Sequence, residues 1–249
     1  MPPVDSKTSP SLPSKPMEHS VTLVTGASRG IGRAIALKFA ALGARVAICG
    51  RDEAALSRVK AELEKFDAPA FSQLADVTKA SDVAALIANT ERTLGPISVL
   101  VNNAGIGLFG PTHEKTEADW DRVLNTNLKS VFLVSRAVAP SMISQGRGDI
   151  INISSLAGKN AFAGGGIYCA SKWGLQGLSA CMAEDLRQYG IRVSVVCPGS
   201  VATDFSGSKP KDASKVLLPD DVAHAVAMIA MQGPQSFLSE VQLRPVRKP

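Results

Sequence analysis

From Val21 onward, short runs of apolar and β-branched residues alternate with longer segments of helical periodicity. The short runs span residues 21–24, 46–48, 97–101, 150–153 and 193–196, and one clear helical segment spans residues 53–66. Such alternation is typical of βαβ units around a parallel sheet. The runs are almost continuously apolar, as strands are when helices cover both faces of their sheet. We therefore predict a Rossmann-like, doubly wound α/β fold whose ligand lies beyond the carboxyl ends of the strands.

The first 19 residues differ from the rest of the chain. They contain five prolines among serines and lysines, and almost nothing apolar. Because such a segment buries little surface, we predict a disordered tail over residues 1–19, and we take Met17 as a candidate natural start. With 45% hydrophobic residues in a chain of 249, residues 20–249 are expected to form a single domain.

Charge and cysteine content exclude several classes of protein. The net charge of +5 arises from three lysines against one aspartate and from the last basic residues (Lys209, Lys211 and Lys215 against Asp212; Arg244, Arg247 and Lys248). No basic run is interleaved with aromatic residues, so nucleic-acid binding is not expected. No apolar run reaches the roughly 20 residues of a membrane helix, which predicts a soluble protein. The four cysteines form no C-x-x-C pair (Cys49, Cys169, Cys181 and Cys197), which favours a reducing compartment, the cytoplasm.

A glycine-rich turn follows the first predicted strand. Its sequence is Gly26-Ala27-Ser28-Arg29-Gly30-Ile31-Gly32, and a helix is predicted over residues 33–41. Glycines allow the backbone to approach a pyrophosphate closely, and the free amides at a helix start stabilise its charge. The spacing differs from the commoner G-x-G-x-x-G, and a tight turn alone would also explain it. Its place in the first βαβ unit favours dinucleotide binding.

The residues at the end of the second strand predict which nucleotide is bound. An enzyme that uses NAD places a carboxylate there against the ribose hydroxyl, whereas this chain has Gly50 and Arg51. Asp52 and Glu53 have the character of helix-start residues. Arg51, with Arg29 from the glycine turn, can pair with a 2′-phosphate, which predicts NADP(H). The alternative is that both arginines are merely solvated.

Tyr168 and Lys172 are one helical turn apart in Tyr168-Cys169-Ala170-Ser171-Lys172. A free tyrosine titrates at about 10, and a neighbouring ammonium lowers that pKa by favouring the phenolate. Tyrosine and lysine share this spacing in many helices by chance, so the pair alone does not establish an acid/base role.

The motifs taken together resemble the short-chain dehydrogenase/reductase family over about residues 20 to 245. They occur in order as the glycine turn, Asn102-Asn103-Ala104-Gly105, Ser154-Ser155, Tyr168 with Lys172, and Pro198-Gly199. The resemblance implies that Tyr168 is the acid/base and that Lys172 lowers its pKa and holds the ribose. Ser155 matches the serine that orients the substrate oxygen, with Ser154 as the weaker choice. Asn127 matches the asparagine that holds a water linked to the lysine, with Asn125 as the rival.

Further cofactor contacts are implied by the resemblance alone. Asp76 and Val77 resemble the pair that meets the adenine, and Val201 with Thr203 the contacts to the carboxamide. The segment Asn102 to Gly105 resembles the loop that lines the cofactor, although Asn and Gly after a strand also make ordinary turns. The implied reaction is hydride transfer between nicotinamide and a carbonyl or alcohol carbon, with Ser155 donating a hydrogen bond to the oxygen. No metal is needed, and His19, His113 and His224 lie outside the constellation.

The sequence leaves the substrate open. Gly107, Leu108 and Phe109, with residues 161–166, suggest a partly apolar and roomy mouth. General likeness through residue 200 favours a 3-oxoacyl-acyl-carrier-protein reductase, but Gly146 and Tyr189 stand where such enzymes have the two arginines for their carrier. The C-terminal part, Leu218-Pro219-Asp220-Asp221-Val222 and Val241-Gln242-Leu243-Arg244-Pro245, resembles 3-hydroxy-acid dehydrogenases and carbonyl reductases more. A remote alternative is a nucleotide-binding regulator without turnover.

Two further expectations concern the whole molecule. Residues 204–216 contain Gly207, Pro210 and three lysines, which suits a mobile lid that would favour an anionic substrate. Solvated lysines without such a role are an equal alternative. The family resemblance implies a homo-oligomer, a tetramer or dimer, and an apolar helix around residues 131–142 would supply a partner surface.

Overall fold

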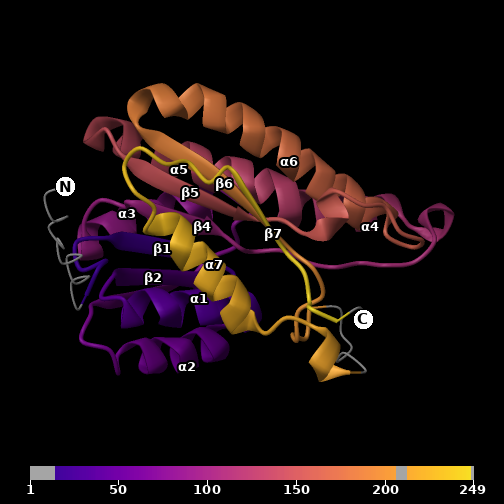
Figure 1. Cartoon of the computed structure of the whole chain (residues 1–249), viewed down its shortest axis with the longest axis horizontal. Helices are drawn as coiled ribbons and strands as arrows, with labels where there is room; N and C mark the ends of the chain where they lie inside the picture. Colours follow the sequence, from indigo (N-terminus) through magenta and orange to yellow (C-terminus); the bar gives the residue numbers. More distant parts are fainter. Residues whose placement is uncertain (1–14, 206–211, 248–249) are drawn as a thin grey trace, which may run out of the picture.

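The computed structural model describes residues 15–205 and 212–247. A seven-stranded parallel sheet forms its centre, in the order β3-β2-β1-β4-β5-β6-β7 (Figure 1). The strands are β1 (Val21–Thr25), β2 (Arg45–Gly50), β3 (Ala70–Leu74), β4 (Val99–Asn102), β5 (Gly148–Ile153), β6 (Ile191–Pro198) and β7 (Glu240–Leu243). The predicted fold class is therefore confirmed.

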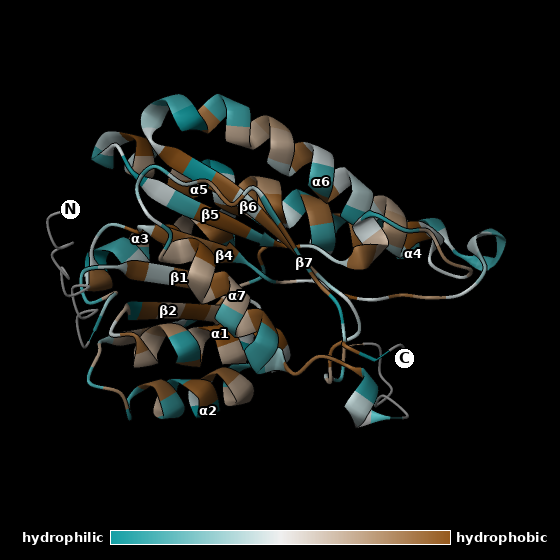
Figure 2. Cartoon of the chain, viewed as in Figure 1, coloured by the Kyte–Doolittle hydropathy of each residue, from teal (hydrophilic) through white to brown (hydrophobic). Residues whose placement is uncertain are grey.

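Helices cover both faces of the sheet. The helices are α1 (Gly30–Ala41), α2 (Glu53–Leu63), α3 (Ala80–Leu94), α4 (Glu117–Leu124), α5 (Ser130–Gln145), α6 (Gly166–Leu186) and α7 (Pro219–Ala230). Apolar residues of α1, α2 and α7 form one core with the sheet, and those of α3, α5 and α6 form the other. Figure 2 shows largely hydrophobic strands between helices whose outer turns are hydrophilic. None of the helices in the described ranges has the length and hydropathy needed to cross a bilayer.

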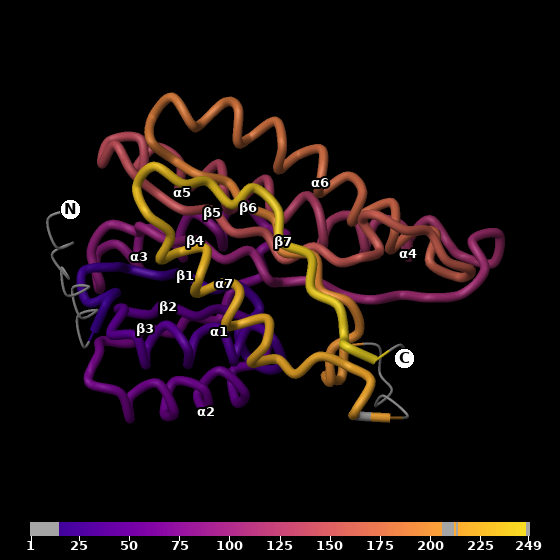
Figure 3. Tube along the Cα trace, viewed as in Figure 1, coloured from indigo at the N-terminus to yellow at the C-terminus, as the bar shows by residue number. Residues whose placement is uncertain are grey.

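Strands β1 and β4 pair with each other, β2 pairs with the other edge of β1, and β5 pairs with the other edge of β4. The direction of the strand order therefore reverses between β1 and β4. A doubly wound sheet opens a crevice at this switch point, beyond the carboxyl ends of the strands. The chain after β7 returns to the segment that leads from β6 to α7, as the trace in Figure 3 shows. The crevice is thus bounded by turns from both halves of the sheet and by the C-terminal residues.

Several element boundaries differ from the sequence-based ones. Helix α1 begins at Gly30, three residues before the predicted start, because the glycine turn itself provides the first helical turn. The edge strands β3 and β7 lack a continuous apolar run, since their residues are half-buried or exposed. Helix α2 ends at Leu63, before the predicted Phe66.

Residues 15–19, which the sequence placed in the disordered tail, pack against the domain. Met17 is 4% exposed, and its amide donates to the carbonyl of Leu42 at 3.0 Å. Lys15 forms an ion pair with Asp67 at 2.7 Å. The predicted boundary of the tail is corrected accordingly, because one buried methionine anchors a segment that composition marks as polar. Residues 1–14 lie outside the described part.

Candidate active site

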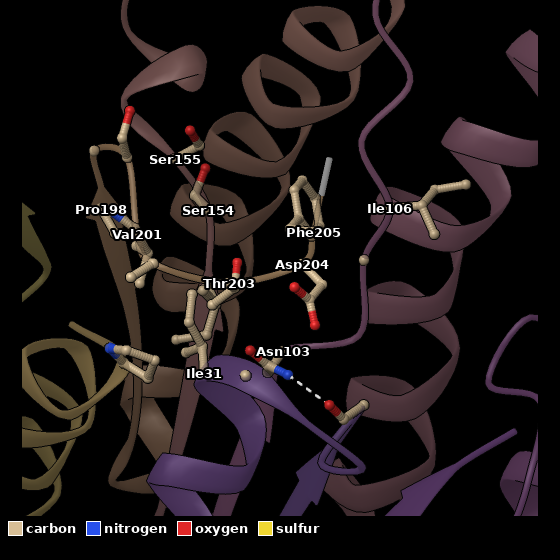
Figure 4. A pocket seen from close by; sticks show the side chains of 18 of the residues that line it. Ile31, Asn103, Ile106, Ser154, Ser155, Pro198, Val201, Thr203, Asp204 and Phe205 are labelled. Atoms are coloured by element: carbon tan, nitrogen blue, oxygen red, sulfur yellow. Dashed lines mark hydrogen bonds between the residues drawn. The ribbon is translucent and has the colours of Figure 1, made fainter. Parts of the chain in front are cut away.

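A cavity of about 1700 Å³ lies at the carboxyl ends of the strands. This volume exceeds the roughly 300–1,000 Å³ of usual small-molecule pockets, so a dinucleotide and a second molecule fit together. Most of the predicted site residues line it (Gly26, Ser28, Arg29, Gly30, Ile31, Arg51, Asp76, Val77, Asn103, Ala104, Gly105, Ser155, Tyr168, Lys172, Pro198, Gly199, Val201 and Thr203). In Figure 4, Ser154 and Ser155 lie on one side, Ile106 on the other, and Thr203, Asp204 and Phe205 between them.

The glycine turn needs its glycines for two physical reasons. Gly26 has φ 63° and Gly30 has φ 57°, a region that side chains other than glycine rarely adopt. A Cβ on Gly26 would also lie 2.7 Å from the Cα of Ala104. Gly32 does not line the cavity; a Cβ there would collide with the Asn103 amide and the Gly26 carbonyl behind the turn. The turn therefore exposes backbone amides at the start of α1, an arrangement that binds anions.

A hydrogen-bonded lock joins this turn to the loop after β4. The Asn103 side chain donates to the carbonyls of Thr25 and Gly26, both at 3.0 Å. The Thr25 hydroxyl oxygen accepts from the amides of Asn103 and Ala104 at 3.0 and 3.1 Å. The role of Thr25 has no signal in the sequence, because its hydrogen-bond partners lie 78 and 79 residues away. The lock fixes both cofactor-side loops relative to each other.

The end of β2 presents no carboxylate to the cavity. Gly50 faces the Ser28 side chain, and Arg51 lines the opening with Arg29. Asp52 caps α2 by accepting from the Ala55 amide at 2.9 Å, which confirms its expected helix-start role. Burial tends to raise the pKa of Asp76, but hydrogen bonds from Thr78 and the nearby charge of Arg51 outweigh it, and the pKa is lowered. This edge of the cavity can therefore take a phosphate beside Arg51.

Tyr168, Ser155 and Lys172 come together where β5 ends and α6 begins. Tyr168 and Lys172 are 7% and 4% exposed, and the Lys172 Nζ donates to the Ile153 carbonyl at 2.9 Å. The Lys172 Nζ lies 5.9 Å from the centroid of the Tyr168 ring. Ser155 lies close enough to Tyr168 to act on its pKa, and its Oγ accepts from the Ala157 amide at 3.1 Å. A hydroxyl, a phenol and an ammonium thus meet at one wall of the cavity.

Burial dominates the protonation of this cluster. It raises the pKa of Tyr168 to about 12, against the hydrogen bond with Ser155, which lowers it. It lowers the pKa of Lys172 to about 8, because the charged ammonium loses its hydration. The Lys172 Nζ donates to the Ile153 carbonyl and lies 5.9 Å from the centre of the Tyr168 ring. Burial decides the net shift of the Tyr168 pKa, which is upward and opposite to the lowering that the resemblance implied. Tyr168 is accordingly a protonated phenol at neutral pH.

The matching proteins identify the chain. The family model described as short chain dehydrogenase matches residues 20–214. The chain belongs to the short-chain dehydrogenase family. A metagenomic short-chain oxidoreductase solved in complex with NADP is 47% identical, with a TM-score of 0.82 over 92% of this chain and 99% of that one. An alcohol dehydrogenase from the archaeon Thermococcus sibiricus, complexed with 5-hydroxy-NADP, is 30% identical, with a TM-score of 0.87 over 92% and 98%. Sepiapterin reductase from Chlorobaculum tepidum is 35% identical over 92% of this chain and 97% of its own.

The structure separates the two pairs of rival residues that the short-chain dehydrogenase motifs left open. Asn127 is 1% exposed; its side chain pairs with the Ile106 backbone and donates to Ser171 at 3.0 Å. Asn125 instead lines a groove outside the main cavity. Ser154 is buried and its Oγ accepts from Gln176 at 2.9 Å, whereas Ser155 faces Tyr168. Asn127 and Ser155 are therefore the members of each pair placed beside the cluster, although Asn127 itself does not line the cavity.

Other predicted features lie at the margin of the site. The proposed lid over residues 204–216 falls partly outside the described residues, including Lys209 and Lys211, and Lys215 lies 4.0 Å from Asp212. His113 is on the surface with 84% of its side chain exposed, and His224 is on α7. Arg244 and Arg247 from the C-terminal segment line the cavity opening, which the sequence analysis did not foresee.

Proposed function

We propose that this protein is an NADPH-dependent oxidoreductase that reduces a carbonyl group to a secondary alcohol. The observation that carries the proposal is the cluster of Ser155, Tyr168 and Lys172 on the wall of a cavity that also contains a glycine cradle for an anion. Oxidation of the alcohol is the same reaction reversed. The high pKa of Tyr168 supports reduction, because a protonated phenol is the form that donates a proton.

The described residues fit NADP(H). Gly26 to Ile31 would hold the pyrophosphate on the amides of α1, and Arg51 with Arg29 would hold a 2′-phosphate in the absence of a carboxylate at Gly50. The bound NADP and 5-hydroxy-NADP of the two solved relatives support this choice. Asp76 and Val77 would contact the adenine, Val201 and Thr203 the carboxamide, and Lys172 the ribose.

The proton steps follow from the positions of the side chains. NADPH, when bound, supplies the hydride to the carbonyl carbon. Tyr168 donates its proton to the carbonyl oxygen, and Ser155, whose Oγ accepts from the Ala157 amide, retains its own hydrogen to donate to that oxygen. Lys172 beside Tyr168 stabilises the phenolate left after proton transfer. Asn127, packed beside Gly105 and near Lys172, would hold a water that returns the proton.

A spectrophotometric assay of NADPH oxidation with a panel of carbonyl compounds tests the proposal. We expect oxidation with at least one free ketone or aldehyde. Oxidation only with acyl-carrier-protein thioesters would favour the 3-oxoacyl reductase alternative. NADPH binding without turnover of any member would favour the regulator alternative.

We further propose that the protein is a homo-oligomer of the reducing cytoplasm. A groove is formed by the end of α4, residues 125–129, α5 and α6; it is largely apolar and is lined by Leu124, Asn125, Leu128, Lys129, Phe132, Gly174 and Leu178. Phe132 and Trp173 beside it are 44% and 53% exposed. Clustered apolar surface of this kind is typical of an interface. The four cysteines are free, which fits a reducing compartment.

A further inference from the structure

Three phenylalanines from three separate loops gather beside Tyr168. Phe109 follows β4, Phe162 lies between β5 and α6, and Phe205 follows β6. All three line the cavity and remain 40%, 49% and 41% exposed. The chain has only eight phenylalanines, so this one place holds three of them. Neighbouring exposed rings next to a reactive hydroxyl indicate a binding surface.

The rings contact one another edge to face around Tyr168. The Phe109 and Tyr168 ring centroids are 5.3 Å apart with an interplanar angle of 69°. Phe205 lies 5.9 Å from Tyr168 at 62°, and Phe162 lies 6.0 Å from Phe109 at 47°. Tilted and edge-on contacts at these separations are favourable for aromatic rings, and they leave ring faces free for another ring.

Two glycines leave the space that the phenylalanine rings occupy. A Cβ on Gly107 would lie 2.8 Å from the Phe205 Cε1 and 2.9 Å from the Phe109 Cε2. A Cβ on Gly165 would lie 2.7 Å from the Phe162 Cζ. The rings therefore pack directly onto bare backbone, and the sequence supplies glycine where each ring needs the space. These close contacts restrict the rings and keep an apolar, aromatic surface beside Tyr168.

The charge next to the rings disfavours an anion there, while Arg244 and Arg247 lie at the opening of the cavity. Asp204 precedes Phe205, and its carboxylate lies between Phe205 and Asn103 in Figure 4. A carboxylate on the substrate would meet like charge there. The described lysine of the predicted lid, Lys215, lies 4.0 Å from Asp212, so its charge is partly balanced. An uncharged, flat substrate group fits the aromatic surface better than the anionic group that the lid lysines suggested.

From this geometry we infer that the substrate is an uncharged ketone or aldehyde carrying an aromatic ring, which packs among Phe109, Phe162 and Phe205. Its carbonyl lies at Ser155 and Tyr168. The carbonyl carbon gains the hydride, the oxygen gains the proton from Tyr168, and the products are the aryl-bearing alcohol and NADP⁺. This inference rests on the proposed function for its chemistry, but the aromatic surface itself does not depend on turnover.

Matched ketones test the inference. 4-Phenyl-2-butanone and 4-cyclohexyl-2-butanone have equally reactive carbonyls and differ in ring aromaticity, and 4-(3-oxobutyl)benzoate adds a charge. We expect kcat/KM with NADPH to be at least about tenfold higher for the phenyl compound than for either of the others, the scale of two aromatic contacts. Equal values, or a preference for the benzoate, would overturn the inference while leaving the proposed function intact.

Two variants locate the effect. Phe162→Leu is expected to raise the KM for the phenyl ketone at least about threefold more than the KM for the cyclohexyl ketone, the scale of one aromatic contact. Phe237→Leu is the matched control, because Phe237 is 38% exposed and lies outside the cavity. Identical changes in both variants, or none in Phe162→Leu, would count against the aromatic surface.

A binding measurement separates failure of the inference from failure of the proposed function. Tyr168→Phe keeps the ring at position 168, so calorimetric titration of this variant with NADP⁺ and each ketone reads affinity without turnover. Tighter binding of the phenyl than of the cyclohexyl ketone supports the inference even if no ketone is ever reduced. Equal affinity overturns it.

Discussion

Lys172 carries a buried ammonium whose pKa controls the stability of the protein. Its pKa is lowered from 10.5 to about 8 by burial. Between these values the unfolded chain binds more protons than the folded one, so stability rises with pH there. The destabilisation is complete below about pH 8 and is absent above pH 10.5. Lys172 therefore lowers the stability of the folded protein at neutral pH, as expected for a functional group.

Replacing Lys172 with methionine makes this cost measurable. We expect the free energy of unfolding of Lys172→Met minus that of wild type to be larger, that is, more stabilising, at pH 7 than at pH 10.5 by roughly 3 kcal/mol, from the size of the pKa shift. Urea denaturation without cofactor measures the difference. A stability difference that does not vary with pH would show that the ammonium is not desolvated.

Arg51 sets the nucleotide preference in this account. We expect wild type to bind NADPH more tightly than NADH, and Arg51→Glu to abolish or reverse the preference, because a carboxylate repels the 2′-phosphate. Fluorescence titration with both nucleotides gives the ratio of affinities. Arg58→Glu on α2 is the control, since it makes the same charge change outside the cavity. Equal effects of the two variants on nucleotide affinity would show that Arg51 acts only through the general electrostatic field of the protein.

At the scale of elements, the β1–α1 turn depends on tight packing against the loop after β4. We expect Gly32→Ala to lower the free energy of unfolding by at least about 1 kcal/mol, and to weaken NADPH binding, because the added methyl collides with Asn103 and the Gly26 carbonyl. Gly233→Ala is the control; its Cβ would meet only the Ser236 Oγ, at 3.9 Å. Thermal and urea unfolding measure both. A Gly32→Ala protein as stable as the Gly233→Ala protein would contradict the expected steric clash at position 32.

The central elements were predictable and the peripheral ones were not. Strands β1, β2, β5 and β6 are largely buried and mostly apolar, so their apolar runs reveal them, whereas β3 and β7 are half-buried or exposed edges. The order of the site motifs indicated Ser155, Tyr168 and Lys172 through family resemblance. Contacts between distant residues had no sequence signal, as with Thr25 and the loop at Asn103 or the three phenylalanines around Tyr168. The same holds for the protonation of the cluster, because burial decides it.

For the whole molecule, the apolar groove around Phe132 predicts self-association. We expect a dimer or tetramer by light scattering at micromolar concentration, and a shift toward monomer in Phe132→Glu, because a charge at that exposed ring would have to be desolvated in the interface. Phe237→Glu, also exposed but away from the groove, is the control. A wild-type monomer would contradict the assembly without affecting the chemistry.

The most direct test of the central claim, that Tyr168 is the proton donor in carbonyl reduction by NADPH, is the kcat of Tyr168→Phe. This change removes only the hydroxyl oxygen, and the ring contacts with Phe109 and Phe205 remain. We predict that kcat for the best ketone falls by at least about 100-fold, the usual scale for loss of a general acid, while the Kd for NADPH changes less than about threefold. A variant with near wild-type kcat would contradict the account.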